Sequence, residues 1–208
     1  MVSFRIRRLP DDDPSVRRYH LFDRAEQLLL VADQGSGWLP PGPPQVRFAR
    51  PDGERVATME LPRPDERRTD RKQNYAVIYE HAVYALITAM DLSSGTSPLN
   101  APPPVGPRPF DRLVIEVEGN RWLGLCVVET GFLLKNSVSE TGPLLVLYDA
   151  AAAGLSATID PEAVDLPEPI GLVEAAGEHE FDLTLPAGRP AQGTLLGLAL
   201  VYLIDNGS

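Results

Sequence analysis

The sequence predicts a mainly β fold in which an antiparallel sheet, made of successive hairpins, curls into a closed barrel around a buried apolar helix. Three observations predict it: an apolar segment near the C-terminus, repeated strand–turn–strand units before it, and proline-rich stretches between those units. Hairpins that follow one another without intervening helices favour antiparallel pairing. We therefore expect a single domain over residues 1–208, with an N-terminal strand and arm over 1–16 and the barrel over 17–205.

The segment Gln192–Ile204 predicts a helix over 192–205 that the rest of the chain encloses. Its residues Leu195–Ile204 carry no charge and are apolar apart from Gly197. A helix that is apolar on all sides belongs in a protein core or in a membrane. Since a helix needs about 20 apolar residues to cross a bilayer, we place this one in the core.

The region from Tyr19 to Asp160 predicts five hairpins, and a further strand follows at Glu180–Leu185. Alternation is strictest around Glu116, as in a strand with one buried face and one wet face. Asp52-Gly53 between two alternating stretches is a strong hairpin signal. The five hairpins are Tyr19–Ala32, Gln45–Leu61, Tyr75–Met90 with a turn at Glu80-His81, Arg112–Val128 with a turn at Glu118–Asn120, and Leu144–Ile159.

Some segments have a second interpretation or no regular structure. Tyr75–Met90 has a helical alternative because it is rich in Ala, Glu and His, but its β-branched and aromatic residues favour strands. The proline-rich stretches Gly35–Pro44 and Ser93–Pro109 cannot be regular structure. Pro161–Gly177 mixes acids, prolines and aliphatic residues, and we expect a third loop there. Loops of this length are usually functional or mobile.

Composition indicates a folded protein of a reducing compartment. The hydrophobic content of 43 % is ordinary for a globular domain. The single cysteine, Cys126, cannot form an internal disulfide, and Met1–Arg8 lacks the apolar core of a signal peptide. We expect a cytoplasmic protein without a transmembrane segment. Arginine replaces lysine everywhere except Lys72 and Lys135, which indicates a GC-rich, bacterial genome.

The net charge of −10 is unevenly distributed. Residues 136–208 hold eleven acids and one base, Arg189, whereas residues 1–135 hold eighteen of each. The chain lacks the basic footprint of a general nucleic-acid binder. Arg5, Arg7 and Arg8 alternate with apolar residues, which we interpret as an edge strand with a charged outer face. A docking surface for an acidic partner is the alternative.

A row of hairpins wrapped on an apolar C-terminal helix resembles the tubby C-terminal-like superfamily, and within it the LURP-one-related and phospholipid-scramblase-like branch. The resemblance spans Arg17 to Asp205. It is carried by Tyr19–Asp23 with Leu28–Val31, by Phe48–Met59, which is similar to the family hairpin D-x-x-G-x-x-V-A-x-I, and by Leu195–Asp205.

The resemblance implies a closed barrel of about twelve strands around the helix. It also implies a largely non-enzymatic role, with binding of phosphoinositides or other membrane lipids in some members. The sequence departs from those members because it is acidic and has two lysines instead of a cluster of bases. Scramblase-type cysteine clusters and a spanning terminal segment are also missing, so we do not expect lipid movement.

Two segments contain candidate binding residues. Arginine pairs well with phosphate, so a run of bases is a candidate anion site, although interleaved acids favour a solvated loop. This run consists of Arg63, Arg67, Arg68, Arg71 and Lys72. Trp38, in a rigid Gly-Pro-rich loop, is a candidate anchor for a partner or a cover over the barrel mouth.

Metal and catalytic sites are not expected. Asp11–Asp13 and Glu178–Asp182 are the metal-like clusters, but neither has the spacing of a calcium loop. Cys126 is far in sequence from the three histidines, and no nucleophile, phosphate-loop or zinc motif occurs. The histidines are His20, His81 and His179, and the acids that a hydrolase would use are Glu116, Glu178 and Asp182. We predict no enzymatic activity, no cofactor and no metal.

The sequence therefore predicts a non-catalytic barrel module that binds a protein partner, or an anionic membrane or ligand surface, through its loops. Two alternatives stay open. One is a structural or assembly subunit joined by complementary basic and acidic surfaces. The other is a carrier of a small apolar ligand, which requires an open lumen.

Overall fold

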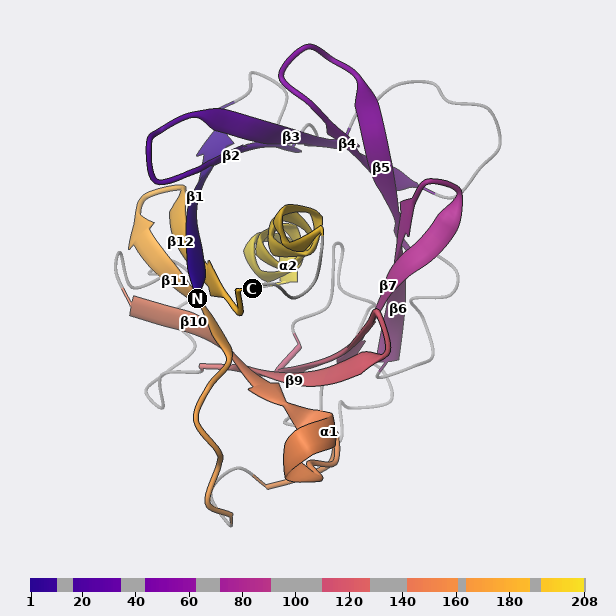
Figure 1. Cartoon of the computed structure of the whole chain (residues 1–208), viewed down its shortest axis with the longest axis vertical. Coiled ribbons are helices and arrows are strands. Elements are labelled where there is room, and N and C mark those ends of the chain that lie inside the picture. Colours follow the sequence, from indigo (N-terminus) through magenta and orange to yellow (C-terminus); the bar gives the residue numbers. More distant parts are fainter. Residues whose placement is uncertain are drawn as a thin grey trace, which may run out of the picture.

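The computed structural model describes residues 1–10, 17–34, 44–62, 72–90, 110–127, 142–160, 164–187 and 192–207. Twelve antiparallel strands form one closed barrel, and helix α2 (Gly193–Gly207) lies inside it (Figure 1). Each strand pairs with its neighbours in the chain, and β1 closes the ring by pairing with β12. The predicted barrel with an enclosed C-terminal helix is confirmed.

The elements follow one another in a simple order. The strands are β1 (Val2–Leu9), β2 (Arg17–Phe22), β3 (Leu28–Gln34), β4 (Gln45–Ala49), β5 (Arg55–Glu60), β6 (Lys72–Tyr79), β7 (Ala82–Met90), β8 (Arg112–Val117), β9 (Asn120–Cys126), β10 (Gly142–Asp149), β11 (Gly171–Gly177) and β12 (Glu180–Leu185). A one-turn helix, α1 (Ala150–Ala153), follows β10.

Four of the five predicted hairpins are confirmed, namely β2–β3, β4–β5, β6–β7 and β8–β9. Three of them turn where predicted, including Asp52-Gly53 between β4 and β5, where Gly53 has a φ of 88°. Glu80 and His81 have φ values of 48° and 66°, and Glu118 and Gly119 have 48° and 75°. Positive φ at both central residues is what a tight two-residue hairpin loop requires. The helical alternative for Tyr75–Met90 is wrong.

The fifth predicted hairpin, Leu144–Ile159, is wrong in its second half. After β10 the chain forms α1, because Asp149 caps its first turn by accepting from the Ala152 amide at 2.9 Å, and Gly154 ends it with φ 63°. The strand that pairs with β10 is β11, which we expected to be a loop. Its inward residues include Gly171 and Ala175, and such small side chains gave a weak apolar signal.

The prediction that the N-terminal segment forms an edge strand is also wrong. β1 pairs with β2 on one side and with β12 on the other. Closure of the barrel therefore joins the first strand to the last one and leaves β1 no open edge.

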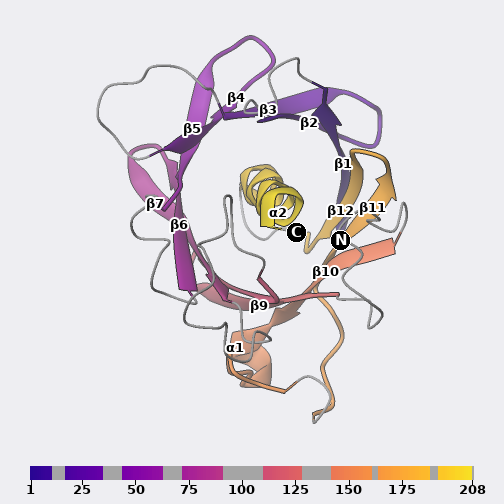
Figure 2. The ribbon, with the colours of Figure 1, turned by 180° about the vertical axis from the view of Figure 1, so that it is seen from behind.

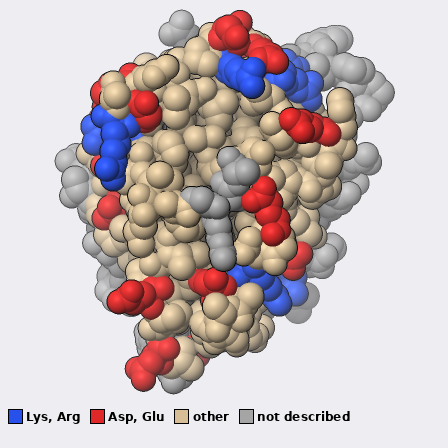
Figure 3. Space-filling model, viewed as in Figure 1, with Lys and Arg blue, Asp and Glu red and all other residues tan. Residues whose placement is uncertain are grey.

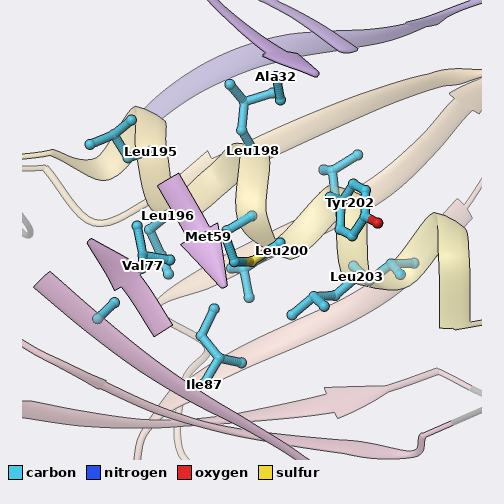
Figure 4. Packing of buried hydrophobic residues seen from close by; sticks show 14 of the residues in the cluster. Ala32, Met59, Val77, Ile87, Leu195, Leu196, Leu198, Leu200, Tyr202 and Leu203 are labelled. Carbon is cyan, nitrogen blue, oxygen red and sulfur yellow. The ribbon is translucent and has the colours of Figure 1, made fainter. Parts of the chain in front are cut away.

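Helix α2 fills the centre of the ring, as views from both ends show (Figures 1 and 2). Every residue from Leu195 to Ile204 is buried. In Figure 4, Leu198 points toward Ala32, and Leu196 and Leu200 point toward the strands that carry Val77 and Met59. Full burial of each leucine stabilises the fold by about 1.5–3 kcal/mol. Helix α2, which we call the plug, and the inward-facing side chains of the strands therefore stabilise one another.

Gly197 lets the helix approach β12. A Cβ atom at this position would lie 2.1 Å from Leu183 Cδ2, in a fully buried part of β12. The glycine that interrupts the apolar run is thus a packing requirement of the plug.

Candidate functional site

The connections of the barrel are distributed unequally between its two ends. In an antiparallel barrel, successive connections alternate between the ends. One end, the turn end, carries the hairpin turns Asp23–Gln27, Arg50–Glu54, Glu80–His81 and Glu118–Gly119, together with the long α1 connection and the connection from β12 to α2. At the other end, the loop end, lie the C-terminus of α2, the short β11–β12 turn and the strand ends that flank the connections 10–16, 35–44, 61–71, 91–111 and 127–141.

The strands that flank the two segments with predicted binding residues have their connecting ends at the loop end. Trp38 belongs to the connection between β3 and β4, and the arginine run belongs to the connection between β5 and β6. Lys72 is exposed at the start of β6, on this end. The remaining predicted residues, Trp38, Arg63, Arg67, Arg68 and Arg71, lie outside the described part of the chain, as does Asp11–Asp13.

A polar cluster surrounds the last turn of α2 at this loop end. Arg8 Nη1 donates to both carboxylate oxygens of Asp205, at 3.0 and 2.9 Å. The Tyr19 hydroxyl donates to Asp205 Oδ2 at 2.5 Å. The Arg8 and Asp205 side chains are only 23 % and 13 % exposed, so this ion pair is largely shielded from solvent.

Further hydrogen bonds tie the cluster to the helix and to β3. Asn206 Nδ2 donates to the Tyr19 hydroxyl at 3.0 Å and to the Tyr202 carbonyl at 2.7 Å. The Tyr202 hydroxyl donates to Gln34 Oε1, and the Tyr19 and Tyr202 rings meet edge to face at 5.9 Å. We call this group the latch; it comprises Arg8, Tyr19, Gln34, Tyr202, Asp205 and Asn206.

The electrostatics of the latch favour anchoring over proton transfer. Burial, and then the neighbouring Asp205 carboxylate, raise the pKa of Tyr19 above its ordinary value. Tyr19 therefore remains a hydrogen-bond donor at neutral pH. Because both oxygens of Asp205 already have donors, the latch holds the end of the plug against β1 and β2.

A second set of charges lies on the outer face of β1. Arg5 Nε donates to Asp182 Oδ1 at 3.0 Å, and Arg7 Nε donates to Glu180 Oε1 at 2.9 Å. Arg7 Nη2 also lies 3.0 Å from Glu26 Oε2, in the β2–β3 turn. We call these five residues the seam, because they join β1 to β12. The assembly alternative paired the basic N-terminal part of one copy with the acidic C-terminal part of another. In the seam, arginines of the first part and carboxylates of the second part pair within one chain.

The seam also accounts for two of the metal candidates. Glu180 and Asp182 share the outer face of β12, but arginines bind their carboxylates. Within the described ranges, no group of three potential metal ligands comes together. Glu178, the third member, is 87 % exposed in the β11–β12 turn and lies 3.7 Å from His179.

The structure does not bring the candidate nucleophile and bases together at one site. Cys126 packs against the core at the loop end of β9, where burial raises the pKa of its thiol to about 12. The thiol is therefore protonated at neutral pH. His20 lies on β2, where burial and Arg18 lower its pKa, while His81 is in a turn at the opposite end. Glu116 is exposed in mid-strand.

The latch was not among the sites predicted from the sequence. Two signals pointed to it. Arg8 breaks the alternation set by Arg5 and Arg7, so it faces the lumen with Ile6. Asp205 is the only charged residue between Gly193 and Gly207. A lone carboxylate at the end of a buried helix requires a partner, and Arg8 is that partner.

Comparison with known proteins gives no match to any family model, curated protein or solved structure. Among the described helices, none combines the length and the apolar character that a bilayer crossing demands.

Proposed function

We propose that this chain is a non-catalytic barrel module that binds a partner protein through the connections at its loop end. The observation that carries the proposal is the unequal distribution of connections. At the turn end, four hairpins close tightly and one long connection, between β10 and β11, leaves the barrel; at the loop end, five long connections leave it beside one tight turn, between β11 and β12. A rigid barrel that presents long loops on one side is a common arrangement for recognition.

The charge of the chain favours a protein over an anionic membrane as the partner. At a net charge of −10, the protein as a whole is repelled by a negatively charged surface. Trp38 suits a protein interface, where a tryptophan is often a central anchor. The arginines of segment 63–71 would supply polar contacts to the same partner.

Membership of the tubby C-terminal-like superfamily remains part of this proposal. The resemblance implies a closed barrel of about twelve strands around a helix, and twelve strands around α2 support it. The carrier alternative needs an open lumen, which α2 occupies with buried apolar side chains. The assembly alternative needs free complementary charges, and the seam uses Arg5 and Arg7 within the chain.

Site-specific photo-crosslinking tests the proposal. We would replace Trp38 with benzoylphenylalanine, and in a matched control replace Asp52, which is exposed in a turn-end hairpin. After irradiation in the source cells, we expect a discrete heavier adduct from position 38 and none from position 52. Equal adducts from both positions, or none from position 38, would contradict loop-end binding.

A vesicle experiment separates a protein partner from a lipid surface. The protein is sedimented with phosphatidylcholine vesicles with or without phosphatidylserine, at low and high salt. We expect no salt-sensitive retention. Retention that is lost in a variant with Arg67, Arg68 and Arg71 all changed to alanine would assign the loop end to anionic lipid instead.

A further inference from the structure

The outer face of the β6–β7 hairpin carries an exposed apolar patch. A bulge between Val77 and Ile78 shifts the register, so that Ile78 pairs with Val83 while Ala76 pairs with Leu86. Val83 is 64 % exposed and Leu86 is 37 % exposed, and Ile78 and Ala76 are half-buried beside them. These four residues, the hairpin patch, lie on the outside of the barrel because Val77 and Ala85 face the core.

Adjacent apolar pairs on an outer wall differ from the scattered apolar residues of an ordinary surface. Single exposed hydrophobic residues need no explanation, but contiguous ones mark contact sites. The seam shows what an outer wall of this barrel looks like when it faces solvent. There, Arg5, Arg7, Glu180 and Asp182 occupy the corresponding outward positions.

Carboxylates border the hairpin patch on its β8 side and at its own turn. Glu116 lies directly opposite Leu86 in the register, Glu80 is in the turn of the hairpin, and Glu118 is in the next turn. All three are exposed. Arg121 faces Glu116 from β9, so the border is acidic in balance but not uniformly so. Figure 3 looks along the barrel axis and not at this wall; on the end that it shows, acidic side chains occur in more places than basic ones, among uncharged atoms.

We propose that the hairpin patch docks a cationic amphipathic segment of another protein. Its apolar side chains cover Val83 and Leu86, and its lysines or arginines meet Glu80, Glu116 and Glu118. The charge complementarity selects this occupant, because the same carboxylates repel an anionic membrane and the identical border of a second copy. The surface is separate from the loop end, so the proposal stands independently of the proposed function.

The test uses a fluorescent Lys/Leu peptide of helical periodicity as the probe and a Glu/Leu peptide as its charge-reversed control. Fluorescence anisotropy measures binding to the full chain. We expect the Lys/Leu peptide to bind in a salt-sensitive manner. The combined change Val83→Ser with Leu86→Ser should weaken binding about tenfold through loss of apolar contact. Glu116→Gln with Glu118→Gln should weaken binding mainly at low salt.

The matched control is Val2→Ser with Val164→Ser, which removes two exposed apolar side chains, 42 % and 40 % exposed, from elsewhere on the surface. It should leave binding unchanged, and circular dichroism should show every variant folded. Equal weakening by this control, equal binding of the Glu/Leu peptide, or no weakening by the patch variant would overturn the proposal. A dimer in solution that Val83→Ser with Leu86→Ser dissociates would overturn it in favour of a second copy.

Discussion

The two faces of β1 use the same chemistry in different surroundings. On the inner face, Arg8 binds Asp205 of the plug, with side chains 23 % and 13 % exposed. On the outer face, Arg5 binds Asp182 of β12, with side chains 39 % and 43 % exposed. Both pairs join the first strand to the end of the chain. Burial, and not the distance between the charged atoms, sets their difference in energy.

The difference shows where the charge complementarity of this chain contributes to stability. The seam resembles many surface ion pairs, each of which contributes little. The latch encloses a carboxylate that would be costly without its donors. The energy that keeps α2 in place at the loop end is therefore concentrated in a few residues, whereas the seam spreads a small energy over several.

Breaking the latch should give the largest effect. Asp205→Ala leaves Arg8 and the Tyr19 hydroxyl without their acceptor in a mostly buried place, and should lower the free energy of unfolding by about 3 kcal/mol. Urea denaturation followed by circular dichroism measures this. A double-mutant cycle with Arg8→Ala should show strong coupling. A loss no greater than that of Asp182→Ala would refute the distinction between the two faces.

Removing one hydroxyl should give an intermediate effect with a distinct pH dependence. Tyr19→Phe loses a hydrogen bond to a carboxylate, which should cost about 2 kcal/mol at pH 7. The pKa of Tyr19 is raised in the folded protein. The wild type should therefore lose stability above pH 10, where the unfolded chain ionises this group and the folded protein does not, by at most about 1.4 kcal/mol per pH unit.

Stability curves from pH 7 to 11 test this dependence. Cys126 adds its own alkaline loss from about pH 9, because burial raises the pKa of its thiol to about 12. The comparison is therefore made in a Cys126→Ala background. There, Tyr19→Phe should make the curve less steep above pH 10, leaving the loss that Tyr84 and Tyr148 contribute, because burial raises their pKa values as well. Parallel curves with and without the Tyr19 hydroxyl would show that this group does not titrate differently on folding.

The seam should give the smallest effect. Asp182→Asn should lower the free energy of unfolding by about 0.5 kcal/mol at low salt, since both partners are more than one-third exposed. The difference should vanish in 1 M NaCl, where charges are screened within about 3 Å. If Asp182→Asn lowers the free energy of unfolding equally in high salt, the seam ion pairs are shielded from solvent as the latch is, and the distinction between them fails.

Much of the fold could be predicted from local sequence. The plug was predictable because a helix with no polar face must be buried, and four hairpins were predictable from alternation and turn residues. β11 was missed because glycine and alanine on its inward face supply little apolar contrast. α1 was missed because four alanines suit either a turn or a strand until Asp149 and Gly154 are recognised as caps.

The latch was harder to predict because its members are distant in the chain. Arg8 and Asp205 are brought together only by two facts of the fold: β1 places Arg8 on its inner side, and α2 runs toward the loop end. The alternation around Arg8 indicates the first fact, but no local pattern shows that this strand meets the end of the helix. Local patterns define the strands, but contacts between the first and last residues depend on how the ring closes.

That closure has a consequence for how the protein is made. A ribosome releases β1 to β10 before it has synthesised β11, β12 and α2, which complete the ring and fill it. Until β11, β12 and α2 have been synthesised, a nascent chain therefore exposes the apolar inner face of its sheet and has an unpaired strand at each edge. Newly synthesised molecules should depend on chaperones for that interval, and a stall just before residue 193 should leave an aggregation-prone product.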